Sequence, residues 1–404
     1  MRKILLIAFL LVSIQDFCQI KDDRVTIGKR ASIYSKILDE NRDYEIYLPP
    51  SYSISNKNVK FPVMYLLDGD GHFHSVSGLV QQLAGGVNGN TLFPEMIIIA
   101  INNTDRTRDL TPVHDAIGPD GREVPFLKTS GGGENFVKFL EMELIPQIES
   151  KYNTAPYRLL VGHSFGGLTA INILLNHTEL FNAYIAIDPS MWWAKRALIK
   201  QAETILPNKS FKGRSLYLAI ANTMPYKMSF ENVDRDSSGT TEHIRAIKNF
   251  VSLAEKNKNN GLRFSWQYFN DDDHGSVPLI AEYYGLRFLF DNYRMNEAKA
   301  TAGIDSLVMH YKMVSDMMGY TILPPENLVN QIGYLYLQAG ETDKAIAHFA
   351  LNIKNYPNSS NVYDSMGDAY LAKGEKAKAR EEFLQALKID PMNAGSKEKL
   401  EKLK

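Results

Sequence analysis

Between about residues 22 and 295, short apolar runs alternate along the chain with longer segments of helical pattern. Several of these runs are nearly continuous, which is typical of central strands covered on both faces. The alternation therefore predicts an α/β fold with a mostly parallel central sheet and helices on both sides. The expected strands span residues 43–48, 62–67, 96–101, 157–161, 184–187, 215–220 and 264–269, and expected helices include 134–151, 167–175 and 241–256.

The pentapeptide GHSFG at positions 162–166 directly follows one of these expected strands, and a helix is expected to begin after it. A serine on a tight turn between a strand and a helix is the setting of a nucleophile elbow. The tight turn strains the backbone at the serine and requires small neighbours, and the helix dipole favours developing negative charge there. The sequence therefore predicts Ser164 as a nucleophile.

The acid and the base of such a site are expected to follow the serine along the chain. His274 lies in the loop after the last expected strand and is predicted as the base, with His163 and His243 as competitors. The acid is expected after strand 215–220, where the next residues carry no carboxylate. Glu242 is favoured, because the stretch between it and His274 accommodates one helix, a turn and one strand. Asp236 is the first alternative, and another residue or no acid at all is the second.

An oxyanion hole requires two backbone N–H groups that point at the substrate oxygen. One is expected from Phe165, the residue after the predicted nucleophile. The other is expected from the glycine-rich turn at positions 68–71, with Gly69 or Asp70 as the donor.

Four motifs in order resemble a known family. They are YLLDG at 65–69, GHSFGG at 162–167, PSMWW at 189–193 and DHG at 273–275. Together they resemble the Putative esterase family of α/β-hydrolases, which includes esterase D-like, siderophore, feruloyl and acetylxylan esterases. The resemblance covers about residues 25–295 and implies an α/β-hydrolase fold that hydrolyses carboxylic esters as a serine esterase, with no metal and no cofactor. The chain departs from the family where the acid is usually carried, straight after its strand.

Two pairs of residues are candidates for substrate binding. Trp192 and Trp193 are predicted to line the pocket, with core packing as the alternative. Arg106 and Arg108 follow strand 96–101 and either bind an anionic or catecholate substrate or fix their loop through neighbouring aspartates.

From about residue 326 the pattern changes to helices with small residues at fixed places, and two stretches match at an offset of 34. This is the pattern of the tetratricopeptide repeat, a helix-turn-helix unit. It predicts a helical linker at 296–325, a small all-α tetratricopeptide-repeat domain at 326–404 and a closing helix at 394–403. Such repeats present a concave surface, so a protein or peptide partner is expected. The matched positions are Gly333, Tyr336, Ala345, Phe349 and Pro357 with Gly367, Tyr370, Ala379, Phe383 and Pro391.

The first residues have the pattern of a secretory signal peptide. Arg2 and Lys3 precede an apolar run at 4–12 that is too short to span a bilayer. We expect a signal peptide at 1–20, an exported chain in the periplasm or outside the cell, and no transmembrane segment once the signal is removed. The hydrolase domain is then expected at 21–295. Since Cys18 is the only cysteine, disulfides are excluded from the mature chain.

The formal net charge of −1 gives no electrostatic case for nucleic acid or an anionic membrane as partner. A small-molecule ester is the expected substrate. Two alternatives stay open. One is an acyltransferase that uses the same serine and histidine, and the other is a repeat-based interaction protein with a vestigial hydrolase domain.

Overall fold

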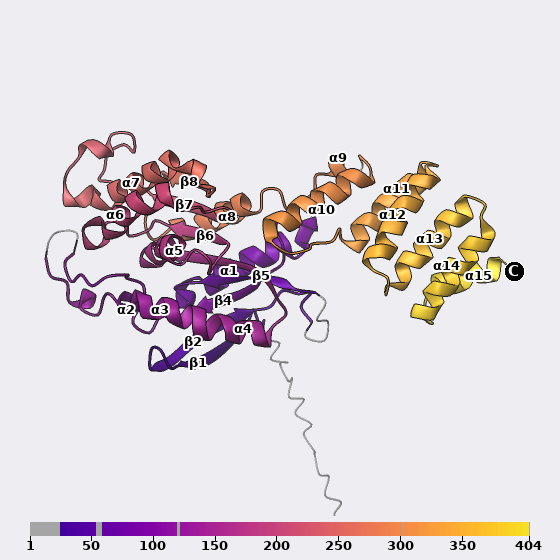
Figure 1. Ribbon diagram of the computed structural model, residues 1–404, viewed down its shortest axis with the longest axis horizontal. Coiled ribbons are helices and arrows are strands. Elements are labelled where there is room, and N and C mark those ends of the chain that lie inside the picture. Colours follow the sequence, from indigo (N-terminus) through magenta and orange to yellow (C-terminus); the bar gives the residue numbers. More distant parts are fainter. Residues whose placement is uncertain (1–24, 54–58, 119–121, 301, 404) are drawn as a thin grey trace, which may run out of the picture.

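The computed structural model describes residues 25–53, 59–118, 122–300 and 302–403, so the predicted signal peptide at 1–20 lies outside the described residues. An α/β unit and a helical unit follow one another along the long axis of the molecule (Figure 1). The strands are β1 (Lys29–Ser35), β2 (Glu40–Tyr47), β3 (Phe61–Leu66), β4 (Ile97–Ile101), β5 (Thr154–His163), β6 (Ala183–Ile187), β7 (Ser215–Ala221) and β8 (Arg263–Phe269). The helices of the α/β unit are α1 (Gly69–Ala84), α2 (Arg106–Asp109), α3 (Gly133–Phe139), α4 (Ile145–Lys151), α5 (Phe165–Asn176), α6 (Trp193–Asn208), α7 (Glu242–Lys256) and α8 (Val277–Leu289). The later helices are α9 (Glu297–Ala300), α10 (Ile304–Met318), α11 (Glu326–Gln338), α12 (Thr342–Asn355), α13 (Ser360–Ala372), α14 (Lys376–Ile389) and α15 (Ala394–Lys402).

The strands form one sheet in the order β1-β2-β4-β3-β5-β6-β7-β8. All neighbouring pairs from β4 to β8 are parallel, whereas β2 runs antiparallel to both β1 and β4. The predicted mostly parallel sheet is therefore confirmed, and β1 is a strand that the apolar pattern did not indicate. The order changes direction between β3 and β5. Ligands bind at such a switch point, beyond the carboxyl ends of the strands.

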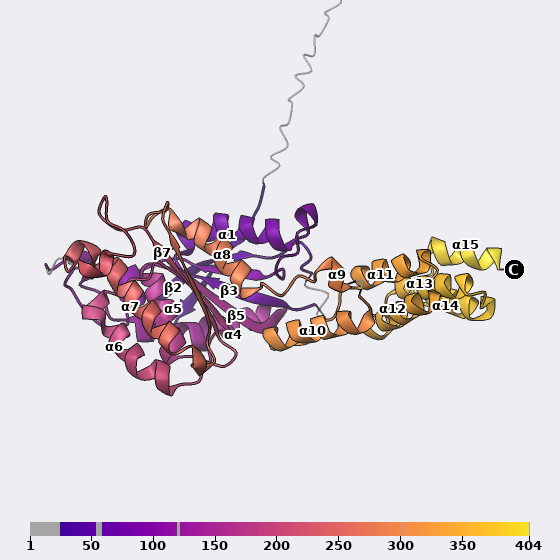
Figure 2. The same ribbon diagram turned by 90° about the horizontal axis from the view of Figure 1, so that it is seen from above.

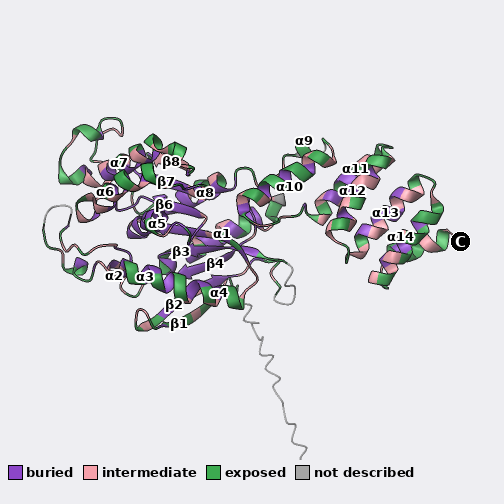
Figure 3. Ribbon diagram, viewed as in Figure 1, coloured by how far each residue is buried: buried purple, intermediate pink, exposed green. Residues whose placement is uncertain are grey.

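Helices cover both faces of the sheet (Figure 2). One core contains side chains of α5, α6 and α7 and of the helical stretch formed by α3, a π turn at Leu140–Leu144 and α4. The other core contains side chains of α1 and α8. Every residue of β3, β4 and β6 is buried, as Figure 3 shows for the middle of the sheet. This explains why these strands are continuous apolar runs in the sequence.

Helix α10 packs against both units. Val314 and Met318 belong to the core on the α1–α8 side of the sheet, whereas Leu307 and Tyr311 cluster with side chains of α11. The segment predicted as a linker thus buries apolar surface at both ends.

The C-terminal helices form two helix-turn-helix pairs, α11–α12 and α13–α14, followed by α15. At the first pair, a Cβ added to Gly333 would lie 2.4 Å from Phe349, and at the second, a Cβ on Gly367 would lie 2.3 Å from Phe383. The glycines are therefore required for close helix packing at equivalent places in both repeats. Within the described residues, no helix is long and apolar enough to cross a membrane.

Candidate active site

Ser164 lies on the turn between β5 and α5, with φ 60° and ψ −113°. A positive φ is uncommon for a residue other than glycine and marks local backbone strain. The turn is so tight that a Cβ on Gly162 would lie 2.3 Å from the carbonyl oxygen of Gly166. The Ser164 N–H donates to the carbonyl of Ile187 on the neighbouring strand β6, over 2.9 Å. The serine is therefore fixed at the carboxyl end of the sheet, at the N-terminus of α5.

The structure brings Ser164 and His274 together. The Ser164 Oγ lies 3.1 Å from His274 Nε2 and 3.2 Å from the hydroxyl of Ser190. On the other side of the imidazole ring, His274 Nδ1 donates to Asp188 Oδ2 over 2.5 Å. The serine hydroxyl thus has a proton acceptor, and the acceptor is oriented by a carboxylate.

Asp188 is fully buried and accepts three hydrogen bonds. Besides His274, its Oδ2 accepts from His243 Nε2 over 2.8 Å, and its Oδ1 accepts from the N–H of Ala221 over 2.9 Å. Burial alone would raise the pKa of Asp188, but the two histidines and the Ala221 N–H lower it overall. The carboxyl group therefore stays ionised and acts only as a hydrogen-bond acceptor.

The prediction of Glu242 as the acid is wrong in this geometry. Glu242 is the first residue of α7, and its carboxylate binds the guanidinium of Arg196 over 2.6 and 2.8 Å. The alternative, Asp236, accepts hydrogen bonds from Ser238 and Thr241 instead. Neither carboxylate is bonded to His274.

The sequence analysis expects the acid after β7, whereas Asp188 directly follows β6. The loop that carries His274 crosses the end of β7, where the Asn222 N–H donates to the carbonyl of Asp272. His274 therefore reaches one strand further than expected. A carboxylate immediately after an apolar strand expected at 184–187 was the available signal.

The residues predicted for the oxyanion hole lie at two helix starts. Phe165 is the first residue of α5 and Gly69 the first of α1. The N–H groups at the start of a helix have no intrahelical acceptor. A Cβ on Gly69 would lie 2.6 Å from the backbone of Ala100, so a side chain is excluded there. Asp70, next on α1, lines the pocket beside Ser164.

Arg106 joins the two backbone segments predicted to form this hole. It binds Asp68, just before α1, through Nε over 2.6 Å and Nη2 over 2.9 Å. Nη2 also donates to the carbonyl of His163, next to Ser164, over 3.2 Å. Burial alone would raise the pKa of Asp68, but Arg106 lowers it overall. Arg106 was predicted either to bind the substrate or to fix its loop through a neighbouring aspartate. This geometry supports a structural role, but the aspartate that Arg106 binds is Asp68.

Arg108 is not among the residues that line the pocket beside Ser164. Its guanidinium binds Glu40 over 2.6 Å and Asp109 over 2.7 Å. It therefore fixes α2 against β2 and its own loop through Asp109, which is the second of the two roles predicted for it, and it does not line the pocket as a substrate-binding residue would.

The two tryptophans have different environments. Trp193 is 1% exposed, packs edge-on against Phe165 with ring centroids 5.1 Å apart, and donates from Nε1 to the carbonyl of Val113. It is a core residue, and its prediction as a pocket residue is wrong. Trp192 is half-buried and lies 6.2 Å from the Phe165 ring. Trp192 keeps surface that a substrate can contact.

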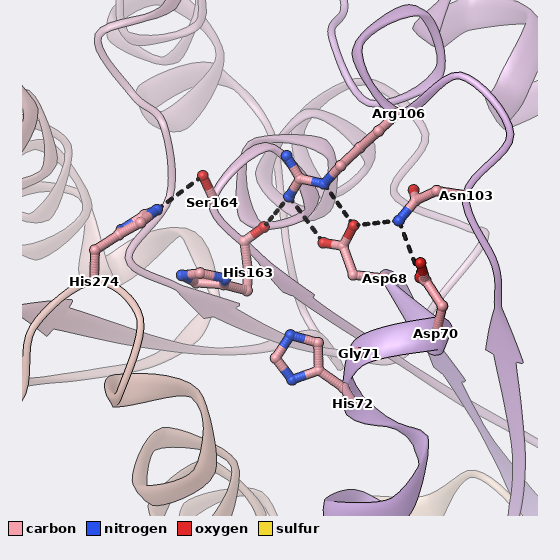
Figure 4. A pocket seen from close by; sticks show the side chains of 9 residues that line it. All are labelled: Asp68, Asp70, Gly71, His72, Asn103, Arg106, His163, Ser164 and His274. Atoms are coloured by element: carbon pink, nitrogen blue, oxygen red, sulfur yellow. Dashed lines mark hydrogen bonds and ion pairs between the residues drawn. The ribbon is translucent and has the colours of Figure 1, made fainter.

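A pocket of about 360 Å³ opens beside Ser164, and its lining is polar (Figure 4). On the wall formed by α1, His72 is paired with Glu282, a buried residue of α8, over 3.4 Å. The hydrogen bond with Glu282 raises the pKa of His72. The lining residues are Asp68, Asp70, Gly71, His72, Asn103, Arg106, His163, Ser164 and His274.

His163 packs against His274, and both residues line the pocket. The two rings lie 4.5 Å apart between centroids, and burial lowers the pKa of His163 to about 4. A neutral His163 places no like charge against the predicted base near neutral pH.

Among the described residues, Asp188, His243 and His274 bring nitrogen and oxygen atoms within 4.8 Å of one another. Their contacts of 2.5 and 2.8 Å are direct hydrogen bonds between ring N–H groups and a carboxylate. These contacts join the three side chains into one hydrogen-bonded cluster.

The sequence model of the family described as Putative esterase matches residues 35–259. The chain belongs to this family. The match runs from the end of β1 to α7 and includes the turn with Ser164 and the buried Asp188. Family membership identifies the chain as an ester hydrolase.

Similar proteins agree with this assignment. The ferri-bacillibactin esterase BesA of Bacillus subtilis is 27% identical over 261 residues, which cover 62% of this chain and 86% of that protein. The siderophore enterobactin esterase of Emericella nidulans is 26% identical over 254 residues, 56% of this chain and 81% of that one. The crystal structure of an IroE-like serine hydrolase from Shewanella oneidensis is 30% identical with a TM-score of 0.69, and covers 80% of this chain and 98% of that one.

Two tetratricopeptide-repeat models match the C-terminal helices, at residues 331–359 and 360–393. These ranges correspond to α11–α12 and α13–α14. The repeats predicted from the 34-residue offset are confirmed.

Proposed function

We propose that this chain hydrolyses carboxylic esters through an acyl-enzyme, with Ser164 as nucleophile, His274 as base and Asp188 as the acid that orients it. The observation that carries the proposal is the continuous hydrogen-bonded chain from Ser164 Oγ through His274 to the buried Asp188. This arrangement lies at the switch point of the sheet and opens onto the pocket.

In the first step, His274 Nε2 takes the proton of the Ser164 hydroxyl as Oγ attacks the ester carbonyl. The carbonyl oxygen becomes an oxyanion, which accepts hydrogen bonds from the N–H of Phe165 and from an N–H of Gly69 or Asp70. His274 then protonates the leaving alcohol oxygen as the carbon–oxygen bond breaks. In the second half, water loses its proton to His274 and attacks the acyl carbon, which releases the acid and restores Ser164.

For the substrate, we propose an ester that presents polar groups next to the scissile bond. The pocket beside Ser164 is lined by carboxylates, imidazoles, an amide and a guanidinium. Since such groups lose hydrogen bonds with water when covered by a hydrocarbon chain, long fatty acyl esters fit poorly there. Siderophore esters, the substrates named for the relatives above, have the required polarity, as do feruloyl and acetyl esters of sugars.

A substrate panel tests this proposal. Wild type and Ser164→Ala are compared on p-nitrophenyl acetate, butyrate and palmitate, on a triserine-lactone siderophore, and on feruloyl and acetyl sugars. We expect short and polar esters to be cleaved by wild type only. Equal rates for both proteins contradict Ser164 as nucleophile, and a preference for palmitate contradicts the polar substrate class. Product analysis with added sugar or alcohol separates hydrolysis from acyl transfer.

We propose further that the chain is exported through its predicted signal peptide and that the repeats bind a protein or peptide. The support is the apolar run at 4–12 for export, and the helical pairs α11–α12 and α13–α14 for binding. Fractionation of cells that express the full chain tests export, and a cytosolic, full-length product contradicts it.

A further inference from the structure

We infer that His243 is a positioning residue of the active site, which shares the carboxylate of Asp188 with His274 and sets how strongly that carboxylate holds the base. The inference rests on the proposed function, because it concerns the same Ser164, His274 and Asp188. It adds a second histidine to the hydrogen-bonded chain.

The two imidazole rings converge on one oxygen atom. His243 Nε2 lies 2.8 Å and His274 Nδ1 lies 2.5 Å from Asp188 Oδ2. The rings are nearly perpendicular, with centroids 5.2 Å apart. Both approach the same side of a carboxylate that has no exposed surface.

The geometry fixes where the protons are. An ionised carboxylate only accepts hydrogen bonds, so the ring nitrogens that face Asp188 must both carry hydrogen. His274 Nε2 is then the unprotonated nitrogen that faces Ser164, as a base requires. The tautomer of His274 is therefore set by Asp188, and His243 is a second donor that shares the same acceptor oxygen.

His243 is held in place by the start of its own helix. Its neighbour Glu242 is bound by two nitrogens of Arg196 from α6, and also by Arg245 over 3.0 Å. These ion pairs fix the first turn of α7 and leave the next side chain, His243, directed at Asp188. The residue predicted as the acid thus acts as an anchor for this histidine.

The second donor changes how the negative charge of Asp188 is shared. With His243 in place, Oδ2 accepts hydrogen bonds from two rings. Without His243, Oδ2 accepts from His274 alone, and that hydrogen bond becomes stronger. A carboxylate that holds the His274 proton more tightly favours the protonated, inactive imidazole. Loss of the His243 donor is therefore expected to move the acid limb of the pH–activity profile to higher pH.

Other charged and titratable groups surround Asp188, His243 and His274, and a substitution of His243 alone leaves all of them unchanged. His163 faces His274 from the end of β5, and Asp273 lies next to it in the β8–α8 loop. Glu242 and Arg196 flank His243. Because none of them is altered, a displaced limb reports on the bond between His243 and Asp188.

The test compares the pH profile of kcat/KM for wild type, His243→Phe and His243→Gln on a short p-nitrophenyl ester. Phenylalanine fills the space without a donor, whereas the glutamine amide reaches the position of Nε2. We expect His243→Phe to shift the acid limb up by about half to one pH unit. At a pH on the acid limb this shift lowers kcat/KM by about 3- to 10-fold, and His243→Gln should restore the wild-type profile. Thermal unfolding checks that each variant is folded.

The inference is overturned if His243→Phe lowers activity without displacing the limb, or if its profile matches wild type. If the phenylalanine variant does not fold, His243→Asn, whose shorter amide cannot reach Asp188, replaces it with the same expected shift. Failure of the proposed function gives a different result, since wild type itself would then be inactive at every pH.

Discussion

Asp188 and His274 follow strands that are not neighbours, β6 and β8, yet a hydrogen bond of 2.5 Å joins them. The loop that carries His274 crosses the end of β7 to reach the buried carboxylate. The proposed acid, Asp188, therefore lies one strand earlier in the chain than the position after β7 that the sequence analysis expects.

The first prediction concerns this acid. Asp188→Asn keeps the shape but removes the charge that orients His274, so kcat should fall by about 10³–10⁴-fold. The measurement is kcat at pH 8 on a short p-nitrophenyl ester. Glu242→Gln is the matched control, because it changes the other predicted acid, and it should retain activity within about 5-fold. A larger loss in Glu242→Gln than in Asp188→Asn would show that the acid is assigned wrongly.

The second prediction concerns the two arginines of α2. Arg106 fixes the turn before α1 against the residue next to Ser164, whereas Arg108 binds Glu40 and Asp109. Arg106→Met should lower kcat/KM by about 10–100-fold, because the turn that is proposed to supply one N–H of the oxyanion hole loses its support. Arg108→Met should lower the melting temperature and leave kcat/KM of the folded protein nearly unchanged. Similar activity losses in both variants would argue against a specific role for Arg106.

Much of the α/β unit could be predicted from the sequence because its central strands are buried on both faces and therefore uniformly apolar. The turn at Ser164 could also be predicted, since the close contact at Gly162 leaves no room for a Cβ and requires glycine there. Strand β1 was not, because it alternates exposed and partly buried residues at the edge of the sheet. The prediction of Trp193 as a pocket residue is wrong because a tryptophan is equally common in a pocket and in a core, and the sequence does not distinguish the two.

The sequence offers several carboxylates after expected strands, Asp188 among them, and tertiary geometry decides which one meets His274. Glu242 is the first residue of α7, as the sequence analysis expects. It is not the acid, because the side chain that faces the site is that of the next residue, His243. Which side chain of a helical turn points inward is decided by packing against α6, through Arg196. Spacing along the chain does not contain that information.

The third prediction concerns the repeats. A Cβ on Gly333 would lie 2.4 Å from Phe349, so Gly333→Ala should destabilise the repeat region by about 1–3 kcal/mol through overpacking. Gly395→Ala is the control, since its nearest contact would be an ordinary 3.5 Å and alanine favours a helix. Urea unfolding followed by circular dichroism measures both. Equal stability of the two variants would contradict the close helix contact.

The fourth prediction is a dependence of stability on pH. Burial lowers the pKa of His163 to about 4 in the folded protein, from an ordinary value of 6.5. Between these values the unfolded chain binds more protons, so the free energy of unfolding should rise with pH and be fully recovered above about 6.5. Asp188, whose pKa is also lowered, adds a loss of stability of the same sign below about pH 4.

Urea unfolding of wild type and His163→Gln between pH 4 and 7 measures the His163 contribution. The variant should show a flatter pH dependence in this range, with His74→Gln as a control histidine substitution on α1. A slope unchanged by His163→Gln would mean that other groups cause the dependence.

The central claim, that Ser164 is the nucleophile activated by His274 and Asp188, is tested most directly by covalent labelling. Intact protein is treated with a fluorophosphonate at pH 8, and the adduct is located by peptide mass spectrometry. We predict one adduct on Ser164, absent in Ser164→Ala and formed much more slowly in His274→Gln and Asp188→Asn. An unlabelled wild type, or an adduct on a different residue, would contradict the account.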